Sequence, residues 1–173
     1  MTIRPAMPGD AAALAAIWNP IIRDTPIIFH SARKTPEGVA EMIVTRTAAG
    51  HGFFVAAEGA AILGLATYAQ FRPGDGYARA MEHTILLAPA ARGRGLGRAL
   101  MAALETHAAG AGAHAMIAAV SAANPAGIGF HAALGYAEVG RLPQVGFKAG
   151  RWLDLVLMQK ILSAAPDMGA AAR

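Results

Sequence analysis

The stretch Arg92-Gly93-Arg94-Gly95-Leu96-Gly97-Arg98 joins two segments of different character. Before it, Thr84-Ile85-Leu86-Leu87 is short, apolar and partly β-branched, which predicts a buried strand. After it, leucines and alanines recur at helical spacing among good helix formers. The stretch is therefore predicted to be a glycine-rich turn between a strand and a helix.

This glycine-rich turn has the properties of an anion site. Three glycines let the backbone approach a ligand closely, and the first turn of a helix carries N–H groups that have no partner within the helix. The helix dipole and the side chains of Arg92, Arg94 and Arg98 add positive charge at the same place. A pyrophosphate is the anion that fits this combination best.

The spacing of the turn excludes two common phosphate loops. Arg98 stands where G-x-G-x-x-G has its last glycine, and no Gly-Lys-Ser/Thr follows as in a P-loop. The stretch instead resembles the Arg/Gln-x-x-Gly-x-Gly/Ala loop of the GCN5-related N-acetyltransferases (GNAT), whose backbone amides hold the pyrophosphate of acetyl-CoA. Taken alone, the motif leaves open a plain arginine- and glycine-rich turn before a surface helix. The loop residues that the resemblance assigns to acetyl-CoA are Arg92, Gly93, Arg94, Gly95, Leu96, Gly97 and Arg98.

Length and composition describe a globular chain. Its 173 residues fit one domain, and with 55% hydrophobic and 15% charged residues it is far from disordered composition. We expect a single acetyltransferase domain over 1–163 and a loose tail over 164–173. No apolar run approaches the length of a membrane span, and no signal peptide is recognisable. The absence of cysteine excludes disulfides and thiolate metal sites, so we expect a cytoplasmic protein without a membrane partner or a metal.

The positive charge of the chain comes mainly from arginine. Twelve of the 15 basic residues are arginines, and the formal net charge is +4. The sequence has neither a lysine/arginine run nor basic residues interleaved with aromatic ones, which argues against a nucleic-acid partner. Arginines gather at 92–98, so an acidic small-molecule ligand is the better interpretation.

The chain is expected to alternate strands and helices. Asp10 is expected to cap a first helix that Pro20 ends or kinks near Asn19, and Thr35 is expected to cap a second. The expected strands are 2–6, 53–57, 62–68, 84–87, 115–120, 137–142 and 152–161, and the other expected helices begin at about 96 and at 124. This β-α-α-β-β-β-α-β-α-β-β order predicts an α/β sandwich around a mixed sheet. It is also the GNAT order, which implies a mostly antiparallel sheet of about seven strands, splayed between strands 4 and 5.

Further stretches narrow the resemblance to one group of enzymes. They are Met81 to Thr84, Ala118 to Asn124, Phe130 to Tyr136 and Val145 to Asp154. With the glycine loop, they resemble the phosphinothricin and methionine sulfoximine/sulfone N-acetyltransferase family. Thr25 to Phe29 and Thr35-Pro36-Glu37 fall where that family has its first substrate-side loop. The resemblance implies acetyl-CoA-dependent acetylation of the amino group of a small amino acid analogue.

Two residues are the candidates for proton transfer. Glu82 precedes the cofactor-side strand and is the expected base, acting directly or through a water, because partial burial raises a carboxyl pKa. The alternative is an exposed glutamate at a strand end. The resemblance places His131 where it can protonate the departing thiolate, or else only pack against the cofactor. His83 faces the other side of the strand and is expected to be structural.

The remaining cofactor contacts are expected around the splayed strand. The backbones of Ile85, Leu86 and Leu87 have N–H and C=O groups that can bind the pantetheine arm and the thioester oxygen. Asn124 is expected to cap the fourth helix and, by resemblance, to bond the cofactor's arm; capping alone is the open alternative.

The acceptor site is expected on two loops. Arg72, Pro73 and Gly74 resemble the loop that touches substrate in this family, and an arginine fork suits a carboxylate and a phosphinyl or sulfonyl oxygen. Phe29 and Tyr77 are expected to form an apolar wall. The chain departs from the family at His30, where relatives carry an acidic or amide residue, and at Gly127, where they carry a small hydroxyl residue.

Three other functions stay open at this point. The first is the same chemistry on a peptide N-terminus or polyamine, which the substrate-loop arginines disfavour for a polycation. The second is a non-catalytic CoA-binding module, and the third is nucleic-acid binding. Family relatives are often dimers, so we expect a homodimer with a small-molecule amine as the other partner.

Overall fold

The computed structural model describes residues 1–162. The expected loose tail, 164–173, lies outside the described residues. The assignment of 1–163 to one domain stays a prediction.

The order of elements follows the sequence-based prediction. Short 3-10 turns at Pro8–Asp10, Asp75–Tyr77 and Pro89–Ala91 supplement the eleven predicted elements. The strands are β1 (Thr2–Pro5), β2 (Phe53–Glu58), β3 (Ala61–Gln70), β4 (Ala80–Leu87), β5 (Ala115–Ser121), β6 (Ala137–Lys148) and β7 (Arg151–Ile161). The helices are α1 (Ala11–Asp24), α2 (Pro36–Ala48), α3 (Leu96–Gly110) and α4 (Pro125–Ala132).

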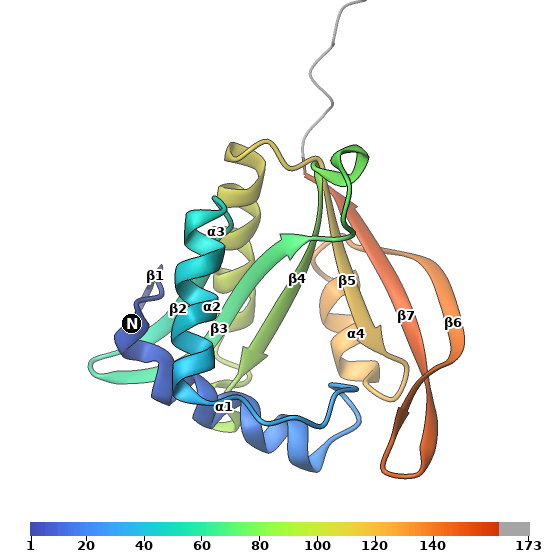
Figure 1. Cartoon of the computed structure of the whole chain (residues 1–173), viewed down its shortest axis with the longest axis horizontal. Helices are drawn as coiled ribbons and strands as arrows, with labels where there is room; N and C mark the ends of the chain where they lie inside the picture. The colour runs from blue at the N-terminus through green and yellow to red at the C-terminus, as the bar shows by residue number, and fades with distance from the viewer. Residues whose placement is uncertain (163–173) are drawn as a thin grey trace, which may run out of the picture.

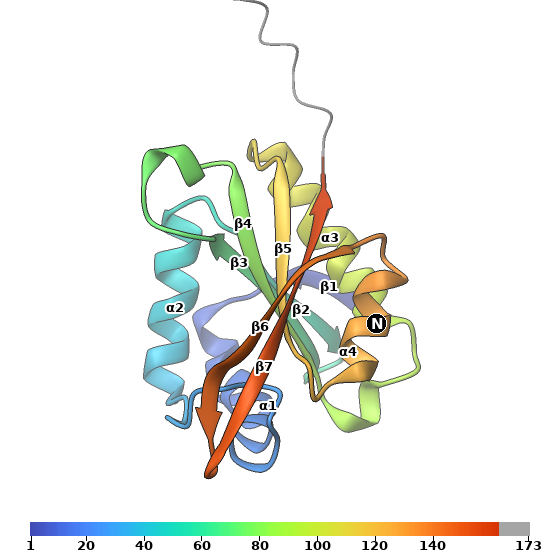
Figure 2. The ribbon, with the colours of Figure 1, turned by 90° about the vertical axis from the view of Figure 1, so that its right-hand side faces the viewer.

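The strands form one seven-stranded mixed sheet, in the order β1-β2-β3-β4-β5-β7-β6. Only the β4–β5 pair is parallel, and every other neighbouring pair is antiparallel. Helices α1 and α2 cover one face, while α3 and α4 lie on the other (Figure 2). The predicted α/β fold, with a mostly antiparallel sheet flanked by helices, is therefore confirmed.

The two central strands separate partway along their length. Pairing between β4 and β5 runs only from Ala80↔Ala115 to Glu82↔Ile117, although β4 continues to Leu87 and β5 to Ser121. Figure 1 shows the two arrows diverging below this point. The predicted splay between strands 4 and 5 is confirmed, and it opens the middle of the sheet.

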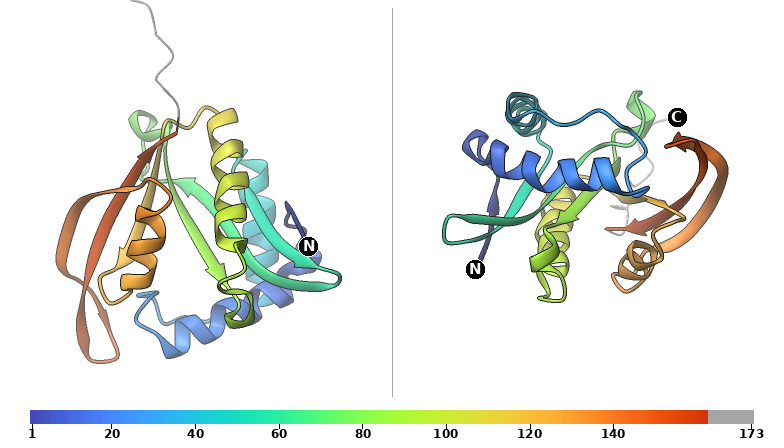
Figure 3. Two further views of the ribbon diagram at one scale, coloured as in Figure 1. Left: turned by 180° about the vertical axis from the view of Figure 1, so that it is seen from behind. Right: turned by 90° about the horizontal axis from the view of Figure 1, so that it is seen from below.

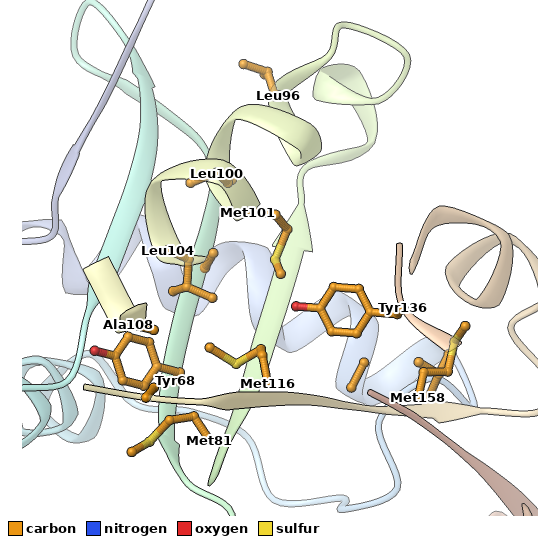
Figure 4. Packing of buried hydrophobic residues seen from close by; sticks show 14 of the residues in the cluster. Tyr68, Met81, Leu96, Leu100, Met101, Leu104, Ala108, Met116, Tyr136 and Met158 are labelled. Atoms are coloured by element: carbon orange, nitrogen blue, oxygen red, sulfur yellow. The ribbon is translucent and has the colours of Figure 1, made fainter. Parts of the chain in front are cut away.

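Each face of the sheet has its own hydrophobic core. Under α3, the buried cluster includes Leu100, Met101, Leu104, Met116 and Tyr136 (Figure 4). Under α1 and α2, a second cluster is centred on leucine, isoleucine and tryptophan side chains: Leu14, Trp18, Ile22, Val39, Ile43 and Leu65. Both helical layers are thereby fixed against the sheet by burial of apolar surface.

Helix α1 corrects the predicted Asp10 cap and shows that Pro20 does not end the helix, while a kink at Pro20 stays a prediction. It continues through Pro20 to Asp24, because Trp18 and Ile22, on either side of the proline, are both buried against the sheet. Tertiary packing thus outweighs the hydrogen bond that a proline removes. Asp10 makes no side-chain cap; its carboxylate instead accepts hydrogen bonds from Arg4 and from the Met7 amide at 2.8 Å.

Some other ends of strands and helices differ from the predicted ones, and others agree. Strand β4 begins at Ala80 rather than at 84, and β6 extends to Lys148, so a two-residue turn replaces the predicted loop before β7. Helix α4 ends at Ala132. The predicted cap at Thr35 is confirmed, since Thr35 Oγ1 accepts from the Gly38 amide at 3.1 Å.

Helix α1 and the loop after it, 25–35, pass across the end of the sheet where β4 and β5 separate. The view from below in Figure 3 shows this segment crossing from the α2 side toward the β6–β7 hairpin. The loop therefore closes one side of the opening between the strands.

Candidate functional site

Two cavities adjoin at the splay between β4 and β5. The first, of about 290 Å³, is lined by Phe29, Glu82 and residues of β4 and β5. The second, of about 320 Å³, is lined by Leu87, Arg92 and residues of α4. The residues that line both are Ile27, Ile85, Leu86, Asn124 and His131. The cavities therefore meet beside the unpaired part of β4, and two molecules bound in them can touch there.

The glycine loop begins at Arg92, which lines the second cavity, whereas Gly93 to Arg98 line neither cavity. Gly93 and Gly95 have φ of 74° and 76°, in the left-handed region that favours glycine. Gly95 caps α3, and the first helical hydrogen bond runs from the Ala99 amide to the Gly95 carbonyl. The amides of Leu96 to Arg98 are thus left without a helical acceptor, as an anion site requires.

Gly97 serves a different purpose in this loop, because α3 approaches α4 closely there. A Cβ at Gly97 would lie 3.0 Å from Cε2 of Phe130. The close approach puts the start of α3 beside α4, the helix that forms the opposite wall of the second cavity.

The three arginines of the loop are not equivalent. Arg92 lines the second cavity, whereas Arg94 forms an ion pair with Glu58, with Nη2 2.7 Å from Oε1. Arg98 is exposed on the first turn of α3. Arg92 is therefore the loop side chain that reaches the second cavity, while cofactor roles for the loop amides, Arg94 and Arg98 stay predictions.

Glu82 is half-buried and lines the first cavity. Burial raises the pKa of its carboxyl group, and the nearby guanidinium of Arg46 partly opposes the rise. Arg46, at the end of α2, is itself half-buried and donates from Nη1 to Thr67 Oγ1 at 3.1 Å. A carboxyl group with a raised pKa inside a cavity is suited to accept a proton during catalysis.

His131 lies between the two cavities and contacts another histidine. Its Nδ1 is 2.7 Å from the Gly127 carbonyl oxygen, and its Nε2 is 3.1 Å from Nε2 of His83. His83 comes from β4 and also lines the first cavity. The burial of His83 agrees with the predicted structural role. Its contact with His131 could not be predicted from the alternation of side chains along the strand.

Asn124 caps α4, as predicted, because its Oδ1 accepts from the Gly127 amide at 3.0 Å. It also lines both cavities, so capping and a cofactor contact are geometrically compatible. Gly127, the departure from the family pattern, is held close to this cap: a Cβ there would lie 2.3 Å from the Asn124 Nδ2 atom. A hydroxyl-bearing residue at 127 would therefore need the asparagine to shift.

Phe29 reaches the first cavity because Gly146 has no side chain that would occupy the position of its ring. A Cβ at Gly146 would lie 2.3 Å from Cδ2 of Phe29, so the ring packs directly on the backbone of β6. Lys148, two residues further on, bonds three carbonyl groups of the segment around Phe29, at Ile22, Thr25 and Ile28. Lys148 and Gly146 stand in a stretch that carried the family resemblance, but their contacts depend on segments distant in sequence.

The predicted second loop does not reach either cavity. Arg72, Pro73, Gly74 and Tyr77 are exposed and line neither of them. The guanidinium of Arg72 lies over the ring of Phe71, 5.2 Å from its centroid. Of the five predicted acceptor residues, the structure brings only Phe29 together with Glu82, and a substrate role for the other four stays a prediction.

The described residues contain neither a helix that could span a membrane nor a group of three metal-ligating side chains. None of the helices in 1–162 combines the length and apolar character needed to span a bilayer. Within the same range, no three histidine, aspartate or glutamate side chains converge as metal ligands do.

Comparison with known proteins identifies relatives along the chain. The model of the acetyltransferase (GNAT) family matches residues 18–136. The chain is 36% identical to the L-methionine sulfoximine/L-methionine sulfone acetyltransferase of Salmonella typhimurium, over 96% of this chain and 99% of that protein. It is 35% identical to the L-amino acid N-acyltransferase MnaT of Escherichia coli, over 92% of each. A GNAT superfamily phosphinothricin acetyltransferase from Sinorhizobium meliloti, solved in complex with acetyl-CoA, superposes with a TM-score of 0.90 at 32% identity, covering 97% and 94% of the two chains.

Proposed function

The chain belongs to the acetyltransferase (GNAT) family, and from that premise we propose that it transfers the acetyl group of acetyl-CoA to the amino group of a small amino acid analogue. The observation that carries the proposal is the junction of two cavities at the splay. One cavity adjoins a glycine loop suited to a diphosphate, and the other contains a carboxylate suited to accept a proton.

The residues beside the second cavity would hold acetyl-CoA. The amides of 96–98 and the Arg92 side chain are suited to its diphosphate, and the unpaired edge of Ile85 to Leu87 is suited to its amide-bearing arm. Acetyl-CoA supplies an acetyl group activated as a thioester. Backbone donors at this edge can also polarise the acetyl oxygen, as in an oxyanion hole.

The residues beside the first cavity would act on the acceptor amine. Glu82, directly or through a water, takes a proton from the ammonium group so that the nitrogen can react. Phe29 provides an apolar wall against the acceptor's side chain. His131, at the junction, supplies a proton to the departing sulfur.

The named activities of the relatives direct the choice of acceptor. One relative is named for methionine sulfoximine and methionine sulfone, and one relative of known structure is named for phosphinothricin. These compounds share an α-amino acid end with a tetrahedral oxygen-bearing centre further along the side chain. We propose this class as the acceptor, with a cytoplasmic homodimer as the working form.

A panel of acceptors tests the proposal. Purified protein is assayed for thiol release from acetyl-CoA with methionine sulfone, methionine sulfoximine, phosphinothricin, spermidine and an alanine-starting peptide. We expect turnover with the first three. Turnover confined to spermidine or the peptide would overturn the acceptor class, and binding of CoA without any turnover would favour a non-catalytic module.

The variant Glu82→Gln tests the mechanism. We expect kcat to fall about 100-fold or more, because proton transfer by a positioned side chain contributes that much, while calorimetry shows unchanged acetyl-CoA affinity. Glu41→Gln, on the exposed side of α2, is the matched control and should behave as wild type. Equal rates in both variants would exclude Glu82 as the base.

A further inference from the structure

The first cavity has two chemically different sides. On the β4 side lies Glu82, and the guanidinium of Arg46 is near enough to act on its carboxylate. The opposite side is formed by the loop 25–35, β5 and β7. Eight of the lining residues come from these three segments, and seven of the eight are alanine, valine, leucine, isoleucine or phenylalanine. The eighth is Ser121, the one polar side chain that the described residues contribute to this side.

Strand pairing places the Ser121 side chain on the same face of the sheet as Glu82. Ile117 is paired with Glu82 in the parallel β4–β5 register, and residues that are neighbours in register project to the same face. Side chains alternate along a strand, so every second residue after Ile117, including Ser121, returns to that face. The partner of Ser121 on β7 is Leu155, which also lines the cavity. Glu82 and Ser121 therefore project into one cavity from the two strands that separate.

The hydroxyl of Ser121 has a hydrogen that it can donate to a molecule in this cavity. Its Oγ accepts from the Ala123 amide at 3.3 Å, and the described residues supply no acceptor for its hydrogen. A hydroxyl group donates one hydrogen bond and accepts up to two. Ser121 is only 1% exposed, and a buried donor that stays unpaired costs free energy. An oxygen atom bound in the cavity would complete its hydrogen bonds.

This side of the cavity does not suit an anionic group. Among the described residues that line the first cavity, none is a lysine or an arginine, and Glu82 contributes a negative charge. Lys148 lies close to the loop, but its Nζ donates to three backbone carbonyls of α1 and the loop. A buried anion would therefore stay unpaired here, which costs much more than burying a neutral oxygen that accepts one hydrogen bond.

We propose that Ser121 is a specificity-determining residue, whose hydroxyl donates a hydrogen bond to an uncharged oxygen on the side chain of the acceptor. The ammonium and carboxylate groups of the acceptor lie toward Glu82 and Arg46, and its side chain extends over β5 toward Phe29. The proposal rests on the proposed function and deepens it. It selects acceptors whose tetrahedral centre is neutral, as in a sulfone or sulfoximine, over acceptors in which that centre is anionic, as in a phosphinate.

Methionine and methionine sulfone test this contact, because they differ only in the sulfone oxygens. In Ser121→Ala we expect kcat/KM for methionine sulfone to fall about fivefold, as the loss of one hydrogen bond to a neutral group predicts. The value for methionine should stay unchanged, since its thioether offers no oxygen to the hydroxyl. An equal fall for both acceptors, or no fall for either, would overturn the proposal.

Two controls accompany this variant. Ser31→Ala removes the hydroxyl of an exposed serine that lines neither cavity, and both acceptors should react there as in wild type. Calorimetry with acetyl-CoA should give the same affinity in Ser121→Ala as in wild type. A lower affinity would assign the hydroxyl to the cofactor and contradict the proposal. Thermal melting shows whether Ser121→Ala is folded.

The wild-type protein provides a test that needs no substitution. At pH 8 the phosphinyl group of phosphinothricin is an anion, whereas methionine sulfone has a neutral tail. We expect kcat/KM for methionine sulfone to be at least about tenfold higher, because the anion would be unpaired in the cavity of Glu82. A preference for phosphinothricin would overturn the proposal, although acetyl transfer, and with it the proposed function, would stand.

Calorimetry distinguishes failure of this proposal from failure of the proposed function. Methionine sulfone and methionine are titrated into wild type and Ser121→Ala, each saturated with CoA, so no turnover is needed. We expect the substitution to weaken binding of the sulfone about fivefold and to leave binding of methionine unchanged. If no acceptor is acetylated, the proposed function fails, and this titration still decides the role of Ser121. Equal changes for the two compounds, or no binding of either to wild type, would overturn it.

Discussion

The ammonium group of Lys148 on β6 lies 2.6 Å from the carbonyl oxygen of Ile28, a residue 120 positions earlier in the chain. The same Nζ donates to the carbonyls of Ile22 at 2.5 Å and Thr25 at 2.9 Å. All three donors of one lysine thus hold the end of α1 and the loop after it. That loop carries Ile27 and Phe29 into the cavity of Glu82.

Removing this lysine should loosen the acceptor site. In Lys148→Met we expect the KM for the acceptor amine to rise about tenfold, since each hydrogen bond to a charged group contributes about 1.5–3 kcal/mol and water replaces part of it. Acetyl-CoA affinity should change little, because the second cavity is lined mainly from β4 and α4. Steady-state kinetics and calorimetry measure the two effects. Arg151→Met, the exposed cross-strand neighbour, is the control; a KM change of the same size there would show a general effect of charge.

A methyl group at Gly146 should displace the Phe29 ring. The added Cβ would lie 2.3 Å from Cδ2 of Phe29, which forces the ring to move. We expect Gly146→Ala to raise the acceptor KM about tenfold, as overpacking of 1–3 kcal/mol predicts, with little loss of cofactor binding. Gly140→Ala on the same strand meets nothing within 4 Å and is the matched control. Combining Gly146→Ala with Phe29→Ala should remove the clash; no coupling between the two changes in a double-mutant cycle would exclude this explanation.

The charge of Arg46 should set the pH range over which Glu82 works. Its guanidinium lowers the pKa of Glu82 against the larger effect of burial. A carboxylate base is active only when deprotonated, so the rate falls as pH decreases through that pKa. In Arg46→Met the pKa rises further, and this acid limb of kcat/KM should move to higher pH, whereas Arg46→Lys should keep it near wild type. An unmoved limb in Arg46→Met would mean that another group produces it.

Substitutions at Asn124 should separate capping from cofactor binding. Asn124→Ala removes the cap of α4 and should lower the free energy of unfolding by about 1 kcal/mol. Asn124→Ser keeps a capping oxygen and should retain most of that stability. If Asn124 also bonds the cofactor's arm, both variants lose acetyl-CoA affinity in calorimetry. Full affinity in Asn124→Ser would restrict this residue to capping.

Local sequence patterns predicted the strand–glycine turn–helix unit well, because the determinants are short-range. A β-branched apolar run, glycines that tolerate positive φ, and helical spacing of leucines act within a few residues of one another. The same holds for the caps at Thr35 and Asn124, each of which bonds an amide three residues away. Element order followed from these units and the turns between them.

The failures occurred where packing acts against local preference. Pro20 should end a helix in isolation, but Trp18 and Ile22 are buried on either side of it. Asp10 has the chemistry of a cap, yet the fold brings the guanidinium of Arg4 within 2.8 Å and engages its carboxylate there. Neither outcome can be derived from the residues that are adjacent in sequence.

For the candidate site, the sequence by itself determined which chemical groups are present: a glycine loop at a helix start, a glutamate before a strand and a histidine on a short helix. Tertiary structure decided which of them meet. It joined the two cavities at the splay, turned His83 toward His131, placed Arg46 near Glu82, and left Arg72 to Gly74 outside the cavity. The physical reason is range: helix and turn preferences act over about four residues, whereas these contacts form between elements that meet only after the sheet has assembled.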